Sequence, residues 1–419
     1  MTDLPRNRGL DAMRVLVVVG LIFFHAALIF DTRDDYYVKN QHTADLSPVA
    51  ALGVVWAMPL LFLTAGLAAW HSLGRRTGAE FIRERARRLL VPLVFGVLVL
   101  MPIPVWFRLR GDPAYHQSYL QFYPEFLHVR LDWGNSPFVL QGTRPDELFE
   151  TGQLWFVVLL LTFSLLLLPL FLWLRGERGA GTMQRLRAAV ERRGVILVPA
   201  IPLAVVTAAL GMEEPYAAWS RWAYLLFFAC GFVLAGDPRF VIATRRNVRS
   251  AAILGVLAFL AALALLSVSK NSGGDPFVDH RLLSVIGRLC YGAAGWCWLV
   301  AIIGLLSRVS VGRRARQDPS RAVRVTGYLS QSVLPVYILH QPVLVAIAFY
   351  VVRWPVPAVV KYLVICAATL VSVFAIYDLL VRRTRVTRFL FGMRTTPRAG
   401  AERAVGPIAH PVSEASRAN

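Results

Sequence analysis

Long apolar runs alternate with short, arginine-rich loops along most of the chain, and this alternation is its dominant pattern. A helix of about 20 apolar residues crosses a bilayer, and tilting or a thin membrane accommodates slightly shorter runs. The pattern therefore predicts an all-α fold, a polytopic bundle of about ten transmembrane helices. We expect the spans at residues 13–30, 49–70, 89–106, 154–174, 195–211, 219–235, 250–268, 282–306, 328–352 and 358–380.

The distribution of basic residues predicts the orientation of this bundle. An even number of spans places both termini on the same side of the membrane. Most of the 45 lysines and arginines lie in the N-terminal segment, in alternate loops and in the C-terminal tail. Cytoplasmic segments carry this excess. We therefore expect both termini in the cytoplasm, and a multi-pass protein of the plasma membrane.

The composition supports a membrane protein and argues against several other classes. Hydrophobic residues make up 56% of the chain, more than a typical soluble domain contains. The net charge of +20 does not indicate nucleic-acid binding, because the arginines lie between apolar runs. The four cysteines lie inside apolar runs, and no histidine spacing suggests a metal site. The sequence also lacks a serine-hydrolase elbow, a P-loop and a dinucleotide-binding glycine pattern.

Three segments outside the predicted spans have distinct compositions. The outward segment 107–153 is long and aromatic, and either holds a substrate or forms a structured cap. The outward loop 31–48 is polar and acidic. The tail 391–419 has no apolar period and is predicted to be disordered. We expect one transmembrane domain, residues 1–390, followed by this cytoplasmic tail.

The first apolar run contains the most informative ionisable residues. From Val15 to Phe30, His25 is the only residue that is neither apolar nor small. Asp11, Arg14 and His25 share one helix face, and His25 is about 16 Å above Arg14, near mid-bilayer. Ionisable groups inside a membrane are candidates for function. The alternative is a cytoplasmic anchor at Arg14 and a helix-packing histidine.

The inner loop 75–92 carries a second candidate site. It is predicted to form an amphipathic helix at the inner surface, with Arg85 and Arg88 as neighbours on one face. Guanidinium groups suit phosphate, for example that of a nucleotide-bearing cofactor. The alternative is an interfacial helix whose arginines only fix the topology.

Two further ionisable residues lie inside predicted spans. His340 is at mid-depth between Pro335 and Pro342, which loosen the helix and free backbone groups that can line a cavity. It is a second catalytic or substrate-contacting group, or a packing histidine. Arg288 contacts a carboxylate or substrate, or reaches the outer interface.

Taken together, these stretches resemble the integral-membrane acyltransferase family 3. LDAMRVLVVVGLIFFH is similar to the family's first helix, and Arg14 and His25 match its Arg-x10-His motif, although position 13 is Met where the family usually has Leu or Trp. Arg85 and Arg88 match its Arg-x-x-Arg, followed by Leu-Leu-x-Pro. GQLWFVVLLLTFSLLL and SVLPVYILHQPVLV resemble two later segments. The branch most similar in pattern is that of glucan biosynthesis protein C.

This resemblance implies an enzyme that moves an acyl group, such as acetyl or succinyl, from cytoplasmic acyl-CoA to a hydroxyl of an extracytoplasmic carbohydrate or related acceptor. Acyl-CoA is then a co-substrate, and no bound cofactor or metal is expected. Arg85, Arg88 and Arg14 would lie near a phosphate of CoA at the inner surface.

The resemblance also suggests roles inside the membrane. We expect neutral His25 to act as general base toward the acceptor hydroxyl. Asp11 is expected to orient Arg14 through an ion pair. Trp155 lines the path of the substrate or packs in the core.

Other functions fit the physical pattern as well. A transporter or flippase of a lipid-linked or small anionic molecule also uses buried His and Arg and proline-broken helices. A sensor or scaffold without chemistry would tolerate changes at His25 and Arg14. The membrane-bound O-acyltransferases have a buried histidine too, but the first-helix motif does not support them.

Overall fold

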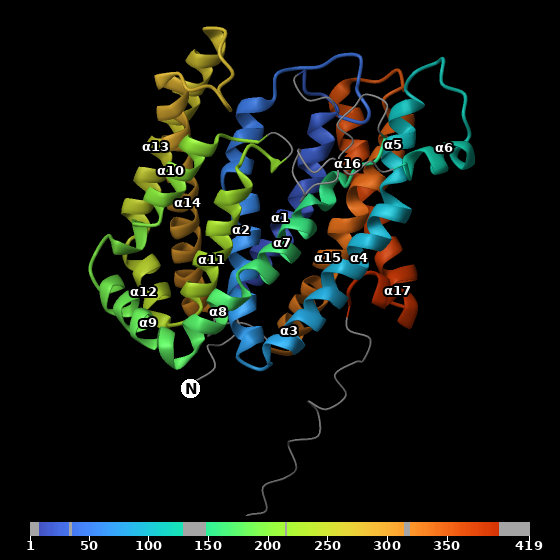
Figure 1. Ribbon diagram of the computed structural model, residues 1–419. Coiled ribbons are helices and arrows are strands. Elements are labelled where there is room, and N and C mark those ends of the chain that lie inside the picture. The colour runs from blue at the N-terminus through green and yellow to red at the C-terminus, as the bar shows by residue number, and fades with distance from the viewer. Residues whose placement is uncertain (1–7, 33–35, 129–147, 214–215, 314–318, 394–419) are drawn as a thin grey trace, which may run out of the picture.

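The computed structural model describes residues 8–32, 36–128, 148–213, 216–313 and 319–393. These residues form α-helices joined by short 3-10 and π segments, with one isolated β-bridge between Asp31 and Ala44. Figure 1 shows the helices side by side in a bundle. The helices are α1 (Arg8–Leu28), α2 (Ser47–Leu73), α3 (Gly78–Arg85), α4 (Val91–Phe95), α5 (Pro102–Leu109), α6 (Tyr119–Phe126), α7 (Trp155–Leu166), α8 (Leu168–Arg175), α9 (Glu177–Val190), α10 (Ala200–Leu210), α11 (Arg221–Leu234), α12 (Pro238–Arg246), α13 (Val248–Asn271), α14 (Leu282–Arg313), α15 (Pro319–Val351), α16 (Ala358–Ile376) and α17 (Arg385–Leu390).

The helices of the described chain confirm the all-α polytopic fold. Seven helical stretches are long and apolar enough to cross a membrane, and the number is ten if each of three bent pairs counts as one span. The bent pairs are α7 with α8, α9 with α10, and α11 with α12, which meet at 50°, 116° and 111°. In the last two pairs the basic helix turns away from the apolar one, because its charged face is stable only at the membrane surface.

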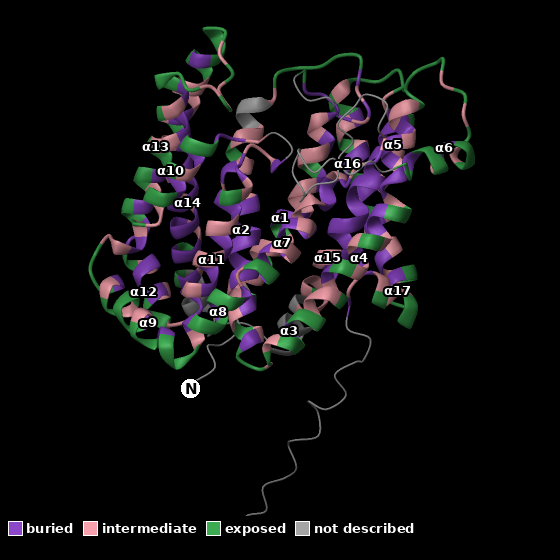
Figure 2. Ribbon diagram, in the orientation of Figure 1, coloured by how far each residue is buried: buried purple, intermediate pink, exposed green. Residues whose placement is uncertain are grey.

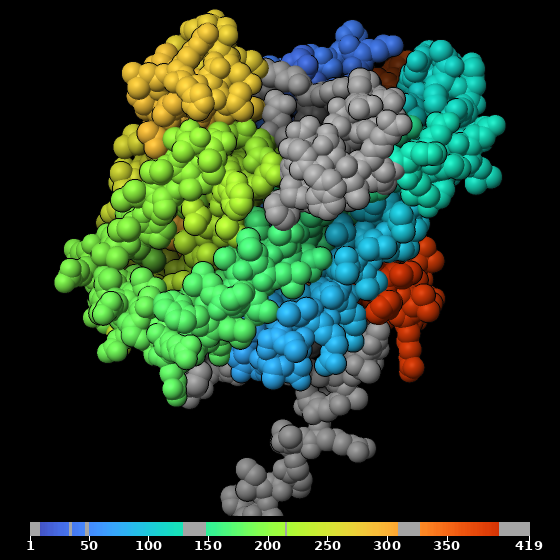
Figure 3. Space-filling model, in the orientation of Figure 1, coloured from blue at the N-terminus to red at the C-terminus, as the bar shows by residue number. Residues whose placement is uncertain are grey.

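The two ends of the bundle differ in charge. Figure 1 shows α3, α9 and α12 at one end, and α6 at the opposite end. The arginines of α3, α9 and α12 thus gather at a single end, and in the space-filling view α9 and α3 form its surface (Figure 3). By the positive-inside rule, we expect this end to face the cytoplasm.

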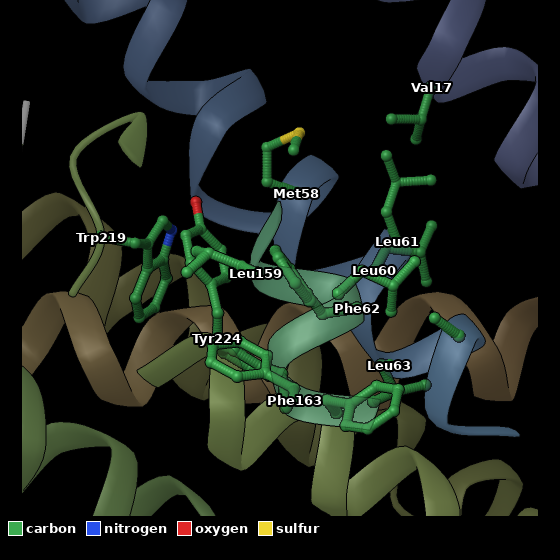
Figure 4. Close-up of a cluster of buried hydrophobic side chains, with 14 of the residues drawn as sticks. Val17, Met58, Leu60, Leu61, Phe62, Leu63, Leu159, Phe163, Trp219 and Tyr224 are labelled. Atoms are coloured by element: carbon green, nitrogen blue, oxygen red, sulfur yellow. The ribbon is translucent and has the colours of Figure 1, made fainter. Parts of the chain in front are cut away.

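Close backbone contacts and large aromatic side chains hold the centre of the bundle together. A Cβ on Gly66 of α2 would lie 2.0 Å from the carbonyl oxygen of Phe228, and one on Gly231 of α11 would lie 2.0 Å from that of Leu63. Only glycine permits this approach, and it brings α2 against α11. Beside the contact, Phe62 stacks on Tyr224 at 4.5 Å between ring centroids (Figure 4).

The N-terminal and C-terminal parts of the chain meet on one side of the bundle. α1 packs against α15 and α16, which are far away in the sequence. A second cluster of buried apolar side chains joins the outer halves of these helices, including Ile22, Leu344 and Ile365, with Tyr36 and Val38 of the first outward loop. Figure 2 shows the buried positions along α15 and α5 in this region. The packing fixes the position of every polar group on α1 relative to α15.

Candidate active site

His25 is in the last turn of α1, directly beneath the first outward loop. The helix ends at Leu28, two residues before the end of the predicted span, because the chain turns back there. The ammonium group of Lys39 donates to the carbonyl oxygens of Leu28 and Asp31 at 2.8 and 2.7 Å, which caps the helix end. His25 is therefore at the outer end of α1, and the loop that follows folds back over it.

The structure brings the two predicted intramembrane histidines together. His340 is fully buried in the interior of α15, and its ring centroid is 5.2 Å from that of His25. The ring of Tyr36, from the outward loop, stacks on the ring of His25, with 5.8 Å between the two centroids. Burial of the two rings favours the neutral form of the imidazoles, since a charge there is costly. The pair can accept a proton from a nearby hydroxyl.

The tautomer of His340 follows from its surroundings. Its Nδ1–H donates to the carbonyl oxygen of Tyr337 over 2.6 Å, so in the neutral ring Nε2 carries the lone pair. Both this Nε2 and the Nδ1 of His25 are buried and have no hydrogen-bond partner within the described chain. These two nitrogens are therefore available to a substrate.

A third segment, at the start of α7, completes the surroundings of the pair. The hydroxyl of Tyr337 donates to the carbonyl oxygen of Gln153, and the side-chain Nε2 of Gln153 donates to the carbonyl oxygen of Ile338 over 3.3 Å. These bonds tie α15 to the 3-10 turn Gly152–Leu154 that precedes α7. Sequence reasoning missed Gln153 and Tyr337, although buried polar residues in an apolar run are a signal that could have found them.

Gly152 permits this turn to lie against the outward loop. Its φ is +45°, and a Cβ would lie 2.2 Å from Cε of Met101 and 3.0 Å from the hydroxyl of Tyr37. That hydroxyl donates to Glu150, whose carboxylate also pairs with Arg108 at 3.4 Å. Burial, followed by the charge of Glu150, raises the pKa of Tyr37 well above its usual value. The hydroxyl therefore stays protonated and holds the loop in place.

The predicted arginines gather at the opposite end of α1. α3 begins with a capping box between Thr77 and Glu80, and Arg85 is its last residue. Arg88 follows in a π-helical segment, Ala86–Leu90, a distortion often found at functional sites. The charges of Arg14 and Arg88 are close enough to Arg85 to act on it electrostatically.

One carboxylate offsets this positive charge in part. Glu84 pairs with Arg76 at 2.6 Å and with Arg88 at 3.4 Å. The Arg88 side chain is still 37% exposed, and the Arg85 guanidinium lies 4.8 Å from the centroid of the Phe81 ring. Several arginines that Glu84 offsets only in part suit an anion with more than one negative charge, such as a nucleotide phosphate.

Three predicted residues remain, which are Asp11, Trp155 and Arg288. Asp11 lies on α1 one turn before Arg14, as expected. Trp155 packs among aromatic rings, 5.5 Å from Tyr224, which favours the packing interpretation. Arg288 is fully buried and donates to the carbonyl oxygens of Ala208, Pro276 and Asp279, so its contacts are those of a structural side chain.

No group of histidines, cysteines or carboxylates suited to a metal ion occurs in the described ranges. The polar groups of the candidate site are imidazoles, amides and hydroxyls at one end of α1 and guanidinium groups at the other. This combination suits proton transfer beside an uncharged reactant, with recognition of an anion at a distance.

Comparison with protein-family models identifies the class. The family model described as an acyltransferase domain matches residues 7–378, which is most of the chain. The chain belongs to this family, which confirms the resemblance to the integral-membrane acyltransferase family 3. It is a multi-pass membrane acyltransferase, acting on acyl groups other than amino-acyl groups. Neither the search of curated proteins nor that of solved structures found a match.

Proposed function

We propose that this acyltransferase takes an acyl group from cytoplasmic acyl-CoA and places it on a hydroxyl of an extracytoplasmic carbohydrate or related acceptor. The observation that carries the proposal is the arrangement of α1. Arg14, near the arginines of the inner end, and His25, in contact with His340 beneath the outward loop, are separated by about three helical turns. An elongated donor with an anionic head and a reactive thioester matches that separation.

The inner arginines are the proposed donor site. Arg85 and Arg88 would bind phosphate oxygens of CoA, and Arg14 would add a third positive charge. Glu84 would give up part of its contact with Arg88 when the phosphate binds, because a phosphate carries more charge and more acceptor oxygens than a carboxylate.

The proposed reaction takes place at His25. The acceptor oxygen bonds to the thioester carbonyl carbon, and the hydroxyl proton passes to a ring nitrogen of His25. The bond between that carbon and sulfur then breaks, and the departing CoA thiolate takes up the proton from His25, which becomes neutral again. A neutral imidazole is suited to this task because it can accept the proton at physiological pH.

We propose acetyl or succinyl as the acyl group, and a plasma-membrane location with the acceptor side outward. A glucan that receives succinyl groups, as the pattern of the glucan biosynthesis protein C branch suggests, is one acceptor of this kind. Transport of a lipid-linked or small anionic molecule is the alternative, and membership of an acyltransferase family favours acyl transfer over it.

The test is binding of acetyl-CoA and succinyl-CoA to the detergent-purified protein, followed by thermal denaturation. A ligand raises the melting temperature of a protein that binds it in the folded state. We expect a rise for wild type that is lost in the Arg85→Ala/Arg88→Ala double variant, and release of free CoA thiol when an acceptor is added. If folded wild-type protein shows no shift with either thioester, the acyl-CoA donor is refuted and transport becomes the better explanation.

A further inference from the structure

The histidine pair is part of a closed ring of contacts between side chains and backbone. The rings of His25 and His340 are neighbours, His340 is hydrogen-bonded to Tyr337, and Tyr337 is hydrogen-bonded to the turn before α7. Gly152 of that turn lies against Tyr37 of the outward loop. The ring of Tyr37 packs edge-on against that of Tyr36, with 5.3 Å between centroids. Tyr36 stacks on His25, which closes the ring of contacts. In order, the ring comprises His25, His340, Tyr337, Gln153, Gly152, Tyr37 and Tyr36.

Several polar atoms on or beside this ring are buried without a hydrogen-bond partner in the described ranges. They are Oε1 of Gln153, Nε2 of His340, Nδ1 of His25 and the hydroxyl of Thr151, which precedes Gly152 in the chain. Thr151, Gln153 and His340 are 3%, 5% and 0% exposed. An unsatisfied buried polar atom is costly, and a ligand that bonds to these atoms would remove that cost.

The chemistry of these atoms specifies the ligand. Gln153 uses its amide nitrogen on Ile338, which leaves the carbonyl oxygen as a pure acceptor. His340 uses Nδ1–H on Tyr337, which leaves Nε2 as a pure acceptor. Thr151 can accept or donate. The ligand must therefore supply hydrogen-bond donors, and it needs no net charge, because none of these four groups is a carboxylate, lysine or arginine.

We propose that Thr151, Gln153 and His340 form an acceptor subsite for a neutral polyhydroxylated ring, in which one hydroxyl is held toward His25 and neighbouring hydroxyls donate to Gln153 and His340. A phosphate or carboxylate has no donors to offer these atoms. A simple alkyl alcohol could satisfy only one of them, whereas adjacent hydroxyls of a sugar ring satisfy two or three. The inference rests on the proposed function, since it takes His25 as the base.

The experiment compares two probes of the same ring shape by thermal denaturation of the detergent-purified protein. Methyl β-D-glucopyranoside carries ring hydroxyls, and 2-methoxytetrahydropyran has the ring without them. We expect only the glucoside to raise the melting temperature of wild type. The Thr151→Val/Gln153→Met variant, which keeps side-chain size but removes the hydroxyl and amide, should lose that shift and retain the shift with acetyl-CoA or succinyl-CoA.

A control variant and a kinetic readout separate binding from folding. Thr207→Val removes an equally buried hydroxyl in α10 that is bonded to Leu203, and it should leave the glucoside shift unchanged. In transfer assays the KM for the glucoside should rise by on the order of tenfold in the Thr151→Val single variant, with little change in the KM for acyl-CoA.

The outcomes distinguish this inference from the proposed function. If the glucoside gives no shift in wild type, or if the double variant keeps the shift, the acceptor subsite is refuted even when acyl-CoA binds normally. If acyl-CoA gives no shift but the glucoside does, the subsite stands and the donor assignment fails.

Discussion

The two ends of α1 solve opposite electrostatic problems. At the inner end, Arg85 and Arg88 are charged, lie close to Arg14 and share a single carboxylate, and Arg88 remains partly exposed. At the outer end, His25 and His340 lie together among buried neutral groups. The partial exposure of Arg88 lowers the cost of its charge at the first end, whereas burial makes a charge on the imidazoles costly at the second. The difference suits the roles we propose, which are anion recognition at one end and proton transfer at the other.

The largest expected effect tests the chemical end. His25→Ala should reduce acyl transfer by about 10²–10⁴-fold, which is the usual contribution of a general base. Binding of acyl-CoA should persist, since the inner arginines are untouched. The measurement is the steady-state rate of CoA thiol release with acceptor present.

The control for this variant is His71→Ala. His71 is exposed and bonded to the Leu67 carbonyl of its own helix, so its loss should leave the rate unchanged. Near wild-type transfer by folded His25→Ala protein would show that His25 is not the base.

At the inner end of α1, substitution of the arginines should have a smaller effect, on acyl-CoA affinity and not on the chemical step. Arg85→Ala/Arg88→Ala should weaken acyl-CoA affinity by about 10–100-fold, because charge-assisted hydrogen bonds are lost. Glu84→Gln removes the competing carboxylate and should leave the affinity unchanged or make it tighter. Equilibrium binding of radiolabelled acyl-CoA measures both, and equal affinity in all three proteins would reduce the arginines to a topological role.

The junction between outward loop and α7 should affect stability more than binding. Gly152→Ala forces a side chain into a left-handed conformation and against Met101, which should cost about 1–3 kcal/mol of unfolding free energy. Gly181→Ala, in α9 with open space around its Cα, should instead stabilise the protein by about 0.5–1 kcal/mol. Thermal denaturation in detergent measures both, and a harmless Gly152→Ala would mean that the loop does not lie against this turn.

The smallest expected effect is the change in unfolding free energy caused by Thr151→Val, which tests a single hydroxyl. Thr151→Val should raise the free energy of unfolding in the absence of ligand, by up to about 1 kcal/mol, because it removes a buried hydroxyl that has no partner in the described ranges. Thr207→Val should lower it slightly, because that hydroxyl bonds to Leu203 over 2.7 Å. If both variants lose stability equally, the Thr151 hydroxyl is a structural group and the outer end is less specialised than we infer.

Several features could be read from local sequence because they depend on neighbours along one helix. The apolar runs predict the helices, and the spacing of Arg14 and His25 predicts that they lie on one face of α1 about three turns apart; that His25 is in the last turn of the helix, and not near its middle, came from the structure. The Arg85–Arg88 spacing likewise predicts two guanidinium groups beside each other. Where local sequence failed, tertiary packing decided the outcome. The sequence left open whether Arg288 contacts a carboxylate or substrate or reaches the outer interface, and in the structure it donates to carbonyl oxygens from two other segments.

The sequence by itself thus determined the membrane-spanning helices, the basic end of the bundle and the family motifs, since each is a matter of hydrophobic length, charge or spacing within a short segment. Only the tertiary structure decided that His25 meets His340, and that Gln153 bonds to Ile338 and Tyr337 in the helical turn before His340. These residues come from three distant parts of the chain. Their meeting depends on how α1 packs against α15 and on the one glycine, Gly152, that lets the start of α7 approach the outward loop.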